Sequence, residues 1–369
     1  MANGREGKLY EEIIEYIKEQ IERGAYQPDD KLPTEQVLAQ MFHVSRITST
    51  RALNELQSMG LIVRRQGSGS YVASKQARGA PQHSEKYIAM IIPYVALQGR
   101  LHEILQGISD TLARRGYHLI IYNSGLDSAS ERTLLLRART NGMCGIILYP
   151  KVDNTNIDIV YDMYINKFPI LLVDKKYSDI PISNVCVDNH KGAYDVTRLL
   201  LDRGHRNIGF VTNRRMEEVY SIRERYFGYC EAMRDFDVPV NFEFVVRSDM
   251  DVQDEPTSIQ QAADISQKLL LGGATALFAV SDVVAFKVLK GCESVGVRVP
   301  DDLSLVGFDN LPQCAYTTPP LTTCEQDFIK VGELAVELLL RQIEHSDYSF
   351  IERRVPAKLC LRESILTIE

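Results

Sequence analysis

The sequence contains no apolar run long enough to cross a membrane and no cysteine pair spaced for a metal or a redox centre. A membrane span needs ~18 consecutive apolar residues, and no stretch approaches that length although 45% of the residues are hydrophobic. The seven cysteines, from Cys144 to Cys360, include no Cys-x-x-Cys pair and are odd in number, so neither a zinc site nor a disulfide framework is indicated. The first residues lack the apolar core of a secretory signal. We therefore expect a cytoplasmic protein with reduced, mostly buried thiols and no membrane partner.

Motifs that bind nucleotide cofactors or carry out catalysis are missing as well. The apolar run at 87–92 is followed by Pro-Tyr-Val-Ala-Leu-Gln instead of the glycine-rich turn of a dinucleotide-binding fold. There is no P-loop, no Gly-x-Ser-x-Gly elbow and no His-Glu-x-x-His helix, and the seven histidines show no ligand spacing. We expect no catalytic centre, no metal and no cofactor.

Positive charge is scarce overall but concentrated in one short stretch. The formal net charge is −7, yet residues 43–78 hold six Lys or Arg against Glu55 alone. Residues 1–42 and 87–369 are both acidic. A compact basic stretch on an acidic protein is the pattern expected where one small surface meets nucleic-acid phosphates, although short basic runs are often only solvated surface.

Three short amphipathic segments precede a glycine-rich hairpin in residues 8–73. The first segment places an apolar residue at every fourth position and ends before Gly24, as in a helix with a glycine C-cap: Leu9, Ile13, Ile17 and Ile21. The second follows Pro33-Thr34 and has apolar positions at Val37, Leu38 and Met41. The third extends from an N-cap at Ser45 to about Met59. Two short strands, 61–65 and 70–73, then flank Gln66-Gly-Ser-Gly.

This order is typical of a winged helix-turn-helix, in which the third helix reads bases and the hairpin approaches the DNA backbone. The third helix buries Ser49, Ala52, Leu53 and Leu56 and turns outward Arg46, Ile47, Thr50, Arg51 and Asn54. Arginines can bind guanine edges or phosphates, and Ile47 can touch a thymine methyl. The alternative is a three-helix unit whose polar face only meets water.

Several motifs in this region resemble the GntR family of winged-helix regulators. They are Lys31-Leu-Pro-Thr-Glu-Gln-Val-Leu-Ala, His43-Val-Ser-Arg, Ala52-Leu-Asn-Glu-Leu, Gly60-Leu-Ile and Gln66-Gly-Ser-Gly-Ser-Tyr-Val. The resemblance implies a DNA-binding domain over residues 1–73. The implied DNA-contacting set, together with the outward face, is Gln36, Ser45, Arg46, Ile47, Thr48, Thr50, Arg51, Arg65, Gln66 and Gly67. Family members usually have a second arginine where this chain has Thr50, so either Thr50 or Arg51 reaches DNA.

Beyond a linker predicted over residues 74–86, short apolar runs alternate with amphipathic stretches. The runs at 87–92, 117–122, 145–149, 170–173, 207–211, 276–280 and 303–307 are predicted strands. Such alternation predicts parallel sheets with helices on both faces, an α/β fold in which ligands bind beyond the carboxyl ends of the strands.

The larger region, residues 87–369, resembles the effector domain of the LacI/GalR family. The motifs are Leu200-Leu-Asp-Arg-Gly-His-Arg-Asn-Ile-Gly-Phe, Arg225-Tyr-Phe-Gly-Tyr, Ser281-Asp-Val-Val-Ala, Val299-Pro-Asp-Asp-Leu-Ser-Leu-Val-Gly-Phe-Asp and Pro320-Leu-Thr-Thr-Cys-Glu-Gln-Asp. The resemblance implies a periplasmic-binding-protein-like domain of two doubly wound α/β lobes that binds a small sugar and forms the dimer. A GntR-type head on this body resembles the arabinose repressors of Gram-positive bacteria, which implies L-arabinose or a related sugar as effector.

Candidate effector-binding residues follow from this resemblance and from strand ends. Arg225 and Asp309 occupy the family's ligand-contacting positions, and Ser281 stands where the family usually has Asn, with Asp282 after it. Gln326, Tyr94, Asp174 and Lys151 are further candidates. An ion pair or a helix cap is the alternative for the charged residues, a surface position is expected for Arg100 and His102, and a structural cap for His205.

These observations together predict a DNA-binding repressor of sugar-utilisation genes and no enzyme activity. A homodimer is implied because a two-fold protein reads a pseudo-palindromic operator, with half-sites spaced by whole helical turns of ~34–36 Å. The alternative is a GntR-type domain fused to an enzyme-derived, aminotransferase-like domain.

Overall fold

The computed structural model describes residues 3–65, 68–73, 86–93, 100–152, 154–177, 179–248 and 255–368, without the side chains of residues 3–9, 47 and 58. The chain forms two compact units, residues 1–86 and 87–369. The predicted linker, 74–86, lies outside the described residues except for Lys86, which begins strand β3 (Lys86–Ile92).

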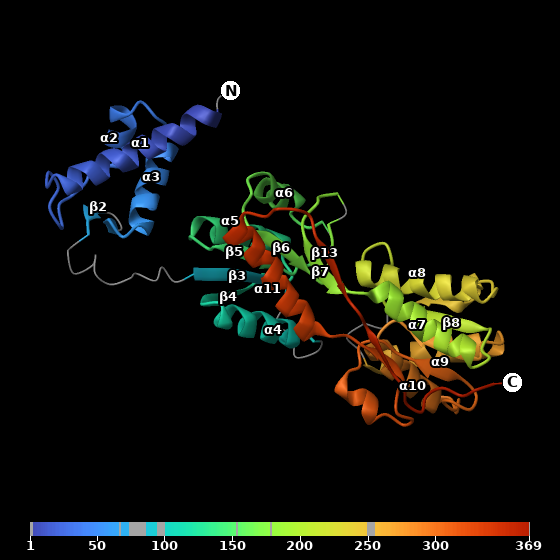
Figure 1. Ribbon diagram of the computed structural model, residues 1–369. Coiled ribbons are helices and arrows are strands. Elements are labelled where there is room, and N and C mark those ends of the chain that lie inside the picture. The colour runs from blue at the N-terminus through green and yellow to red at the C-terminus, as the bar shows by residue number, and fades with distance from the viewer. Residues whose placement is uncertain are drawn as a thin grey trace. The chain divides into compact units, whose positions relative to one another are not determined.

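The smaller unit has three helices and an antiparallel hairpin, as the sequence predicts (Figure 1). Its elements are α1 (Asn3–Glu22), α2 (Glu35–Met41), α3 (Arg46–Ser58), β1 (Ile62–Arg65) and β2 (Gly69–Val72). The hydroxyls of Thr34 and Ser45 cap α2 and α3 by accepting bonds from Val37 N and Thr48 N. These caps satisfy N–H groups that have no partner within the helix.

A small core joins the three helices to the hairpin. Buried side chains from α1, α2, α3, β1 and β2 make it up: Ile13, Ile17, Leu38, Leu53, Leu56, Ile62 and Val72. The expected inward face of α3 is confirmed, because Ser49, Ala52, Leu53 and Leu56 are all buried. In α2 only Leu38 is buried, while the other two apolar positions, Val37 and Met41, are exposed. Because α2 has only seven residues, a single side chain of this helix reaches the core.

The larger unit consists of two lobes, each a parallel sheet with flanking helices. Lobe 1, residues 87–187 and 328–355, has a six-stranded sheet of order β13-β7-β6-β5-β3-β4. Its elements after β3 are α4 (Leu101–Arg114), β4 (Tyr117–Asn123), α5 (Ser128–Thr140), β5 (Gly145–Leu148), α6 (Ile157–Ile165), β6 (Ile170–Val173), β7 (Asn184–Val187), α11 (Phe328–His345) and β13 (Glu352–Val355).

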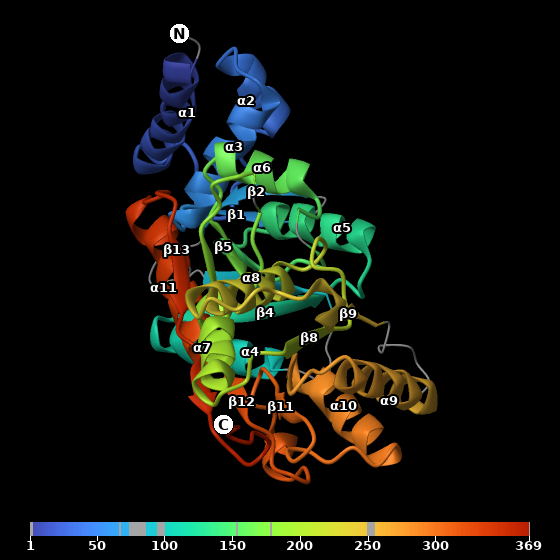
Figure 2. The same cartoon turned by 90° about the vertical axis from the view of Figure 1, so that its right-hand side faces the viewer.

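Lobe 2, residues 189–325 and 358–368, has a four-stranded parallel sheet of order β11-β10-β8-β9. Its elements are α7 (Asn189–Asp202), β8 (Ile208–Thr212), α8 (Tyr220–Asp235), η1 (Phe242–Phe244), β9 (Val245–Arg247), α9 (Glu255–Leu271), β10 (Ala276–Ala279), α10 (Asp282–Ser294), β11 (Ser304–Val306) and η2 (Pro312–Ala315). Strands β12 (Thr323–Glu325) and β14 (Lys358–Cys360) form an antiparallel pair, and α9 packs beside α10 (Figure 2).

Each of the seven predicted strands is present with its ends within one residue of the prediction. Strands β7, β9, β12, β13 and β14 were not predicted. Each of them contains polar or charged residues within three or four positions, so none forms a continuous apolar run like those of β5, β6 and β10. Arg225 lies on α8, which begins at Tyr220.

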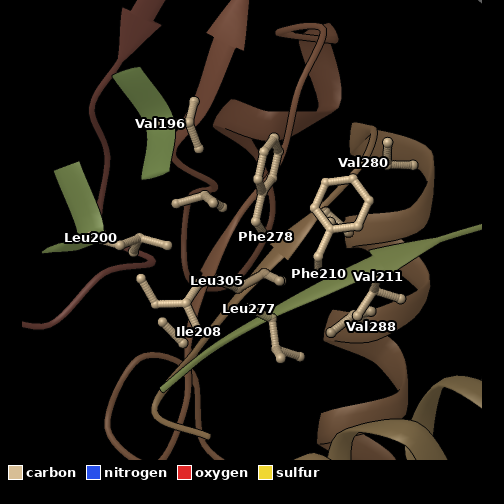
Figure 3. Packing of buried hydrophobic residues seen from close by; sticks show 14 of the residues in the cluster. Val196, Leu200, Ile208, Phe210, Val211, Leu277, Phe278, Val280, Val288 and Leu305 are labelled. Atoms are coloured by element: carbon tan, nitrogen blue, oxygen red, sulfur yellow. The ribbon is translucent and has the colours of Figure 1, made fainter. Parts of the chain in front are cut away.

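The core of lobe 2 is built around aromatic rings on neighbouring strands. Phe210 of β8 and Phe278 of β10 pack edge to face with their ring centroids 5.3 Å apart, and aliphatic side chains surround them (Figure 3). Both rings are fully buried. This continuous apolar layer holds the ends of β8, β10 and β11 in fixed positions.

Three chain segments cross between the lobes: from β7 to α7, from β12 to α11 and from β13 to β14. The last of these leaves β13 in lobe 1 and runs to lobe 2 (Figure 1). Residues that follow strand ends in the two lobes therefore come together beside these crossing segments.

Two glycines set the distance between α4 and α11 in lobe 1. A Cβ atom at Gly107 would lie 2.2 Å from the carbonyl oxygen of Ile329, and one at Gly332 would lie 2.4 Å from that of Ile104. Such contacts are impossible, so the two backbones approach closely only because both residues are glycine. This packing fixes the N-terminal end of α4, where Arg100 lies.

Candidate effector cavity and DNA-binding face

A cavity of about 260 Å³ lies between the two lobes. It is close to the lower end of the ~300–1,000 Å³ range of ligand clefts. Lobe 1 and the crossing segment contribute Arg100, Leu101, Ile104, Tyr149, Asp174, Gln326 and Phe328; lobe 2 contributes Asn213, Val219, Ser221, Ile222, Arg225, Val280, Ser281, Val283, Asp309 and Leu311. Five sequence candidates are thereby brought together: Asp174, Arg225, Ser281, Asp309 and Gln326.

The two carboxylates of the cavity come from opposite lobes and share a backbone feature. Asp174 directly follows β6 in lobe 1, and Asp309 lies three residues after β11 in lobe 2. Both have positive φ angles, 61° and 126°. Residues other than glycine rarely adopt such angles, and those that do cluster at functional sites.

Arg225, on α8, is the most constrained polar side chain of the cavity. Its Nε donates to Asn189 Oδ1 at 2.8 Å, one terminal nitrogen donates to the Val280 carbonyl at 2.6 Å, and the other lies 3.3 Å from Asp309 Oδ1. The guanidinium also stacks on the Phe308 ring at 3.9 Å from its centroid. These contacts fix the guanidinium against the Asp309 carboxylate.

Burial shapes the ionisation of both carboxyl groups. Burial, with the nearby charges of Asp282 and Asp174, raises the pKa of Asp309 to about 7, while Arg225 and Arg100 oppose the shift. Burial also raises the pKa of Asp174, although Tyr149 donates a hydrogen bond to it at 2.7 Å. Gln326 Nε2 donates to Asp309 Oδ1. The cavity thus holds two carboxyl groups that titrate above the usual range of aspartate.

Two other candidates lie away from the cavity, and a third lies outside the described residues. Asp282 does not line the cavity: its Oδ1 accepts from Thr323 Oγ1 and its Oδ2 from Leu311 N, so it supports the loop after β11. Lys151 does not line the cavity either; its backbone N–H donates to the Glu131 carboxylate and its carbonyl oxygen accepts from Lys175. Tyr94 lies outside the described residues.

The expectation that Arg100 lies at the surface is wrong. Only 14% of its side chain is exposed; it lines the cavity and donates to the Asp309 carbonyl oxygen at 2.8 Å. The residue comes from lobe 1 and its partner from lobe 2, a contact that local sequence does not predict. His102 is exposed, as expected. His205 is buried away from the cavity and bonds Thr275 and the Leu366 carbonyl.

Some lining residues were not predicted from the sequence. Tyr149 directly follows β5 and Asn213 directly follows β8, so the strand-end rule that pointed to Asp174 applies to them as well. No sequence pattern of this kind marks Phe328, at the start of α11, or the apolar side chains of α4 and α8 that line the cavity. Their position depends on how the two lobes meet.

In the smaller unit, the N-terminal turn of α3 presents a polar surface. Ser45 and Arg46 are exposed, and Thr50 is partly exposed with its hydroxyl donating to the Arg46 carbonyl. Thr48 is nearly buried and its hydroxyl lies 2.8 Å from that of Ser45. Gln36, on the first turn of α2, is exposed. The side chain of Ile47 and both Gln66 and Gly67 lie outside the described residues.

The arginines of the basic stretch divide between internal contacts and the exposed surface. Arg64 contacts Glu35 of α2 and Asn54 of α3, and so ties the hairpin to both helices. Arg65 lies over the Tyr71 ring at 4.6 Å and 3.4 Å from Asp29. Arg51 lies over the Tyr10 ring of α1 at 4.4 Å. These aromatic contacts orient the guanidiniums while leaving Arg65 and Arg51 exposed.

Both units match known protein families. Residues 9–72 match the model of bacterial regulatory proteins of the gntR family, and residues 197–365 match that of the periplasmic binding protein-like domain. This chain combines a gntR-type DNA-binding domain with a periplasmic binding protein-like domain, the organisation of a transcriptional repressor. The aminotransferase-like alternative is wrong, because the larger unit matches a binding-protein domain and the related proteins are regulators rather than enzymes.

Similar proteins include the arabinose metabolism transcriptional repressor of Geobacillus stearothermophilus, 28% identical over 341 residues that cover 91% of this chain and 90% of the relative. The HTH-type transcriptional repressor CytR of Escherichia coli K12 is 27% identical over 294 residues, covering 80% of this chain and 83% of the relative.

Among solved structures, a LacI family transcriptional regulator from Enterococcus faecium with bound ribose aligns with a TM-score of 0.62 and 24% identity. The alignment covers 77% of this repressor and 100% of that chain. Within the part of the repressor that the structure describes, no helix is both long and apolar enough to span a bilayer.

Proposed function

We propose that the repressor controls sugar-utilisation genes and that its effector is a neutral monosaccharide, L-arabinose or a related sugar, bound between the lobes. The observation that carries this proposal is the convergence of Asp174, Arg225 and Asp309 on one cavity. Carboxylates and a guanidinium bind the adjacent hydroxyls of a sugar, and the apolar wall formed by Phe328, Val219 and Ile222 suits the C–H face of its ring.

The charge distribution favours a neutral sugar over a phosphorylated one. Arg225 is bonded to Asp309, and both Arg100 Nε and a terminal nitrogen contact the Glu103 carboxylate at 2.7 Å. A phosphate in the cavity would have to compete with these carboxylates for the guanidiniums, whereas sugar hydroxyls can donate to Asp174 and Asp309. The names of two relatives also support a pentose: one is an arabinose metabolism transcriptional repressor and another a ribose operon repressor.

A thermal-unfolding screen of the full chain tests the effector class. The probes are L-arabinose, D-ribose, D-xylose and D-galactose, together with ribose 5-phosphate and glucose 6-phosphate. A ligand at 100 times its Kd stabilises by ~2.7 kcal/mol. We expect one free sugar to stabilise the parent and the control Asp237→Asn, which replaces an exposed carboxylate outside the cavity, and to stabilise Asp309→Asn much less. Stronger stabilisation by a phosphorylated sugar, or none by any sugar, would overturn the proposal.

For DNA, we propose that a cytoplasmic homodimer binds a pseudo-palindromic operator through α3 and the β1–β2 hairpin. The exposed Arg46 at the start of α3 supports this role. DNA selected by the protein from a random pool should contain two inverted half-sites, and sedimentation should give two chains per duplex. A single half-site or a stable monomer on DNA would contradict the dimer. The effector should change operator affinity by ~5- to 150-fold, and operator should change effector affinity by the same factor.

A further inference from the structure

A second cavity, of about 290 Å³, lies next to the effector cavity at the segments that cross between the lobes. Its lining residues are Arg100, Glu103, Glu325, Gln326, Asp327, Ile329, Pro356 and Lys358. Arg100 and Gln326 line both cavities. They are therefore the side chains that separate one cavity from the other.

Both separating residues are held by the same aspartate. Arg100 donates to the Asp309 carbonyl oxygen at 2.8 Å, while Gln326 donates to the Asp309 carboxylate. Glu103 holds the other side of the Arg100 guanidinium through two contacts of 2.7 Å. Gln326 is 2% exposed. The separating wall is thus bonded at several points.

The second cavity has the polar character of a sugar-binding surface and is open to solvent. Three carboxylates and one ammonium group line it, from Glu103, Glu325, Asp327 and Lys358. Asp327, Pro356 and Lys358 are exposed. Its volume is similar to that of the effector cavity, so the space behind the wall matches one further sugar ring with acceptors for its hydroxyls.

We propose that Arg100, together with Gln326, sets the length of the ligand by closing the effector cavity against this second cavity. This inference rests on the proposed sugar effector and deepens it. With the wall in place the site accepts a single ring. Without the Arg100 side chain, a disaccharide places one ring between Asp174 and Asp309 and the other in the second cavity.

Two substitutions of Arg100 distinguish the effect of the bulk of its side chain from the effect of its hydrogen bonds. Arg100→Ala removes both the bulk of the side chain and its bond to Asp309. Arg100→Met removes the bonds but keeps an unbranched stem that extends as far as the position of the arginine Nε, so part of the wall remains in place. The matched control is His102→Ala, on the same turn of α4, because His102 is exposed and lines neither cavity.

Calorimetric titration of the full chain with L-arabinose, D-xylose, α-1,5-L-arabinobiose and xylobiose tests the proposal. The parent and His102→Ala should bind a monosaccharide and reject the disaccharides. Both Arg100 variants should bind the monosaccharide more weakly, but only Arg100→Ala should bind a disaccharide. Its affinity for the disaccharide should be at least about ten-fold higher than that of the parent, because even one methylene group more or less changes discrimination in a pocket by ~10- to 200-fold. Gln326→Ala, which opens the wall from the other side, should also gain disaccharide binding.

Several outcomes would overturn the proposal. One is a parent that binds a disaccharide as tightly as a monosaccharide, and another is an Arg100→Ala variant that folds normally, binds the monosaccharide and rejects disaccharides. If the parent binds neither of these monosaccharides nor any free sugar of the thermal screen, the proposed effector class fails. A crystal structure of Arg100→Ala then tests the wall independently of any ligand. One continuous cavity supports it, and two separate cavities refute it.

Discussion

Effector affinity should depend on pH near neutrality, because the carboxyl group of Asp309 ionises there. Burial and the neighbouring Asp282 and Asp174 raise the pKa of Asp309 to about 7 against the opposing charges of Arg225 and Arg100. A sugar hydroxyl donates to the ionised carboxylate, whereas a protonated carboxyl group loses an acceptor and its attraction to Arg225. Acidification should therefore weaken binding.

The size of the effect follows from the fraction ionised. With a pKa of about 7, the ionised fraction falls from ~0.9 at pH 8 to ~0.1 at pH 6, so the Kd should rise ~10-fold, or ~1.4 kcal/mol. The raised pKa of Asp174 acts in the same direction. The effect of this carboxyl group on folding, without effector, has the opposite sign. Between pH ~4 and ~7 the folded state keeps a proton that the unfolded chain has lost. The contribution of the group to the free energy of unfolding therefore decreases as the pH rises through this range and is constant above it.

Calorimetric titration with the sugar identified by screening, between pH 6 and 8, measures the effect. Repeating the titrations at pH 7 in two buffers of different ionisation enthalpy gives the number of protons released on binding. Asp309→Asn should bind more weakly and lose most of the pH dependence. A Kd that is constant between pH 6 and 8, with no proton release, would refute the reasoning.

Three further predictions concern the cavity, the DNA-binding face and the packing of lobe 1. Arg225→Met should weaken effector binding by ~2–5 kcal/mol, measured by calorimetry, because Asp309 is left without its charged partner; operator affinity without effector should stay unchanged. Arg46→Ala should weaken operator binding by ~1–3 kcal/mol and relax base preference, whereas Arg65→Ala should weaken all sequences alike and lower the salt slope by about one in binding titrations. Gly332→Ala should reduce the free energy of unfolding by ~1–3 kcal/mol in urea titrations, since its Cβ would lie 2.4 Å from the Ile104 carbonyl; an unchanged midpoint would show that α4 and α11 can separate at no cost.

Local sequence patterns were sufficient for much of the architecture. The strands of both lobes that were predicted are short apolar runs, and all except β4, which lies at the edge of its sheet, are largely buried. The helices of the smaller unit follow from apolar spacing, from N-cap hydroxyls at Thr34 and Ser45 and from Gly24 and Gly60, both at positive φ. These are short-range effects, in which a residue and its neighbours determine the local backbone.

Asp174 was recognisable from the sequence because it follows a predicted strand, and the carboxyl ends of parallel strands meet at one edge of a sheet. Arg225 and Asp309 were recognisable from the motifs that contain them. Which charged side chains face the cavity depends instead on the tertiary structure. Asp282 is bonded to Thr323, and Arg100 reaches Asp309, a residue 209 positions further along the chain, from the other lobe. The physical reason is that a buried charge is placed by the partners that offset its desolvation, and here those partners lie on elements that meet only when the two lobes fold together.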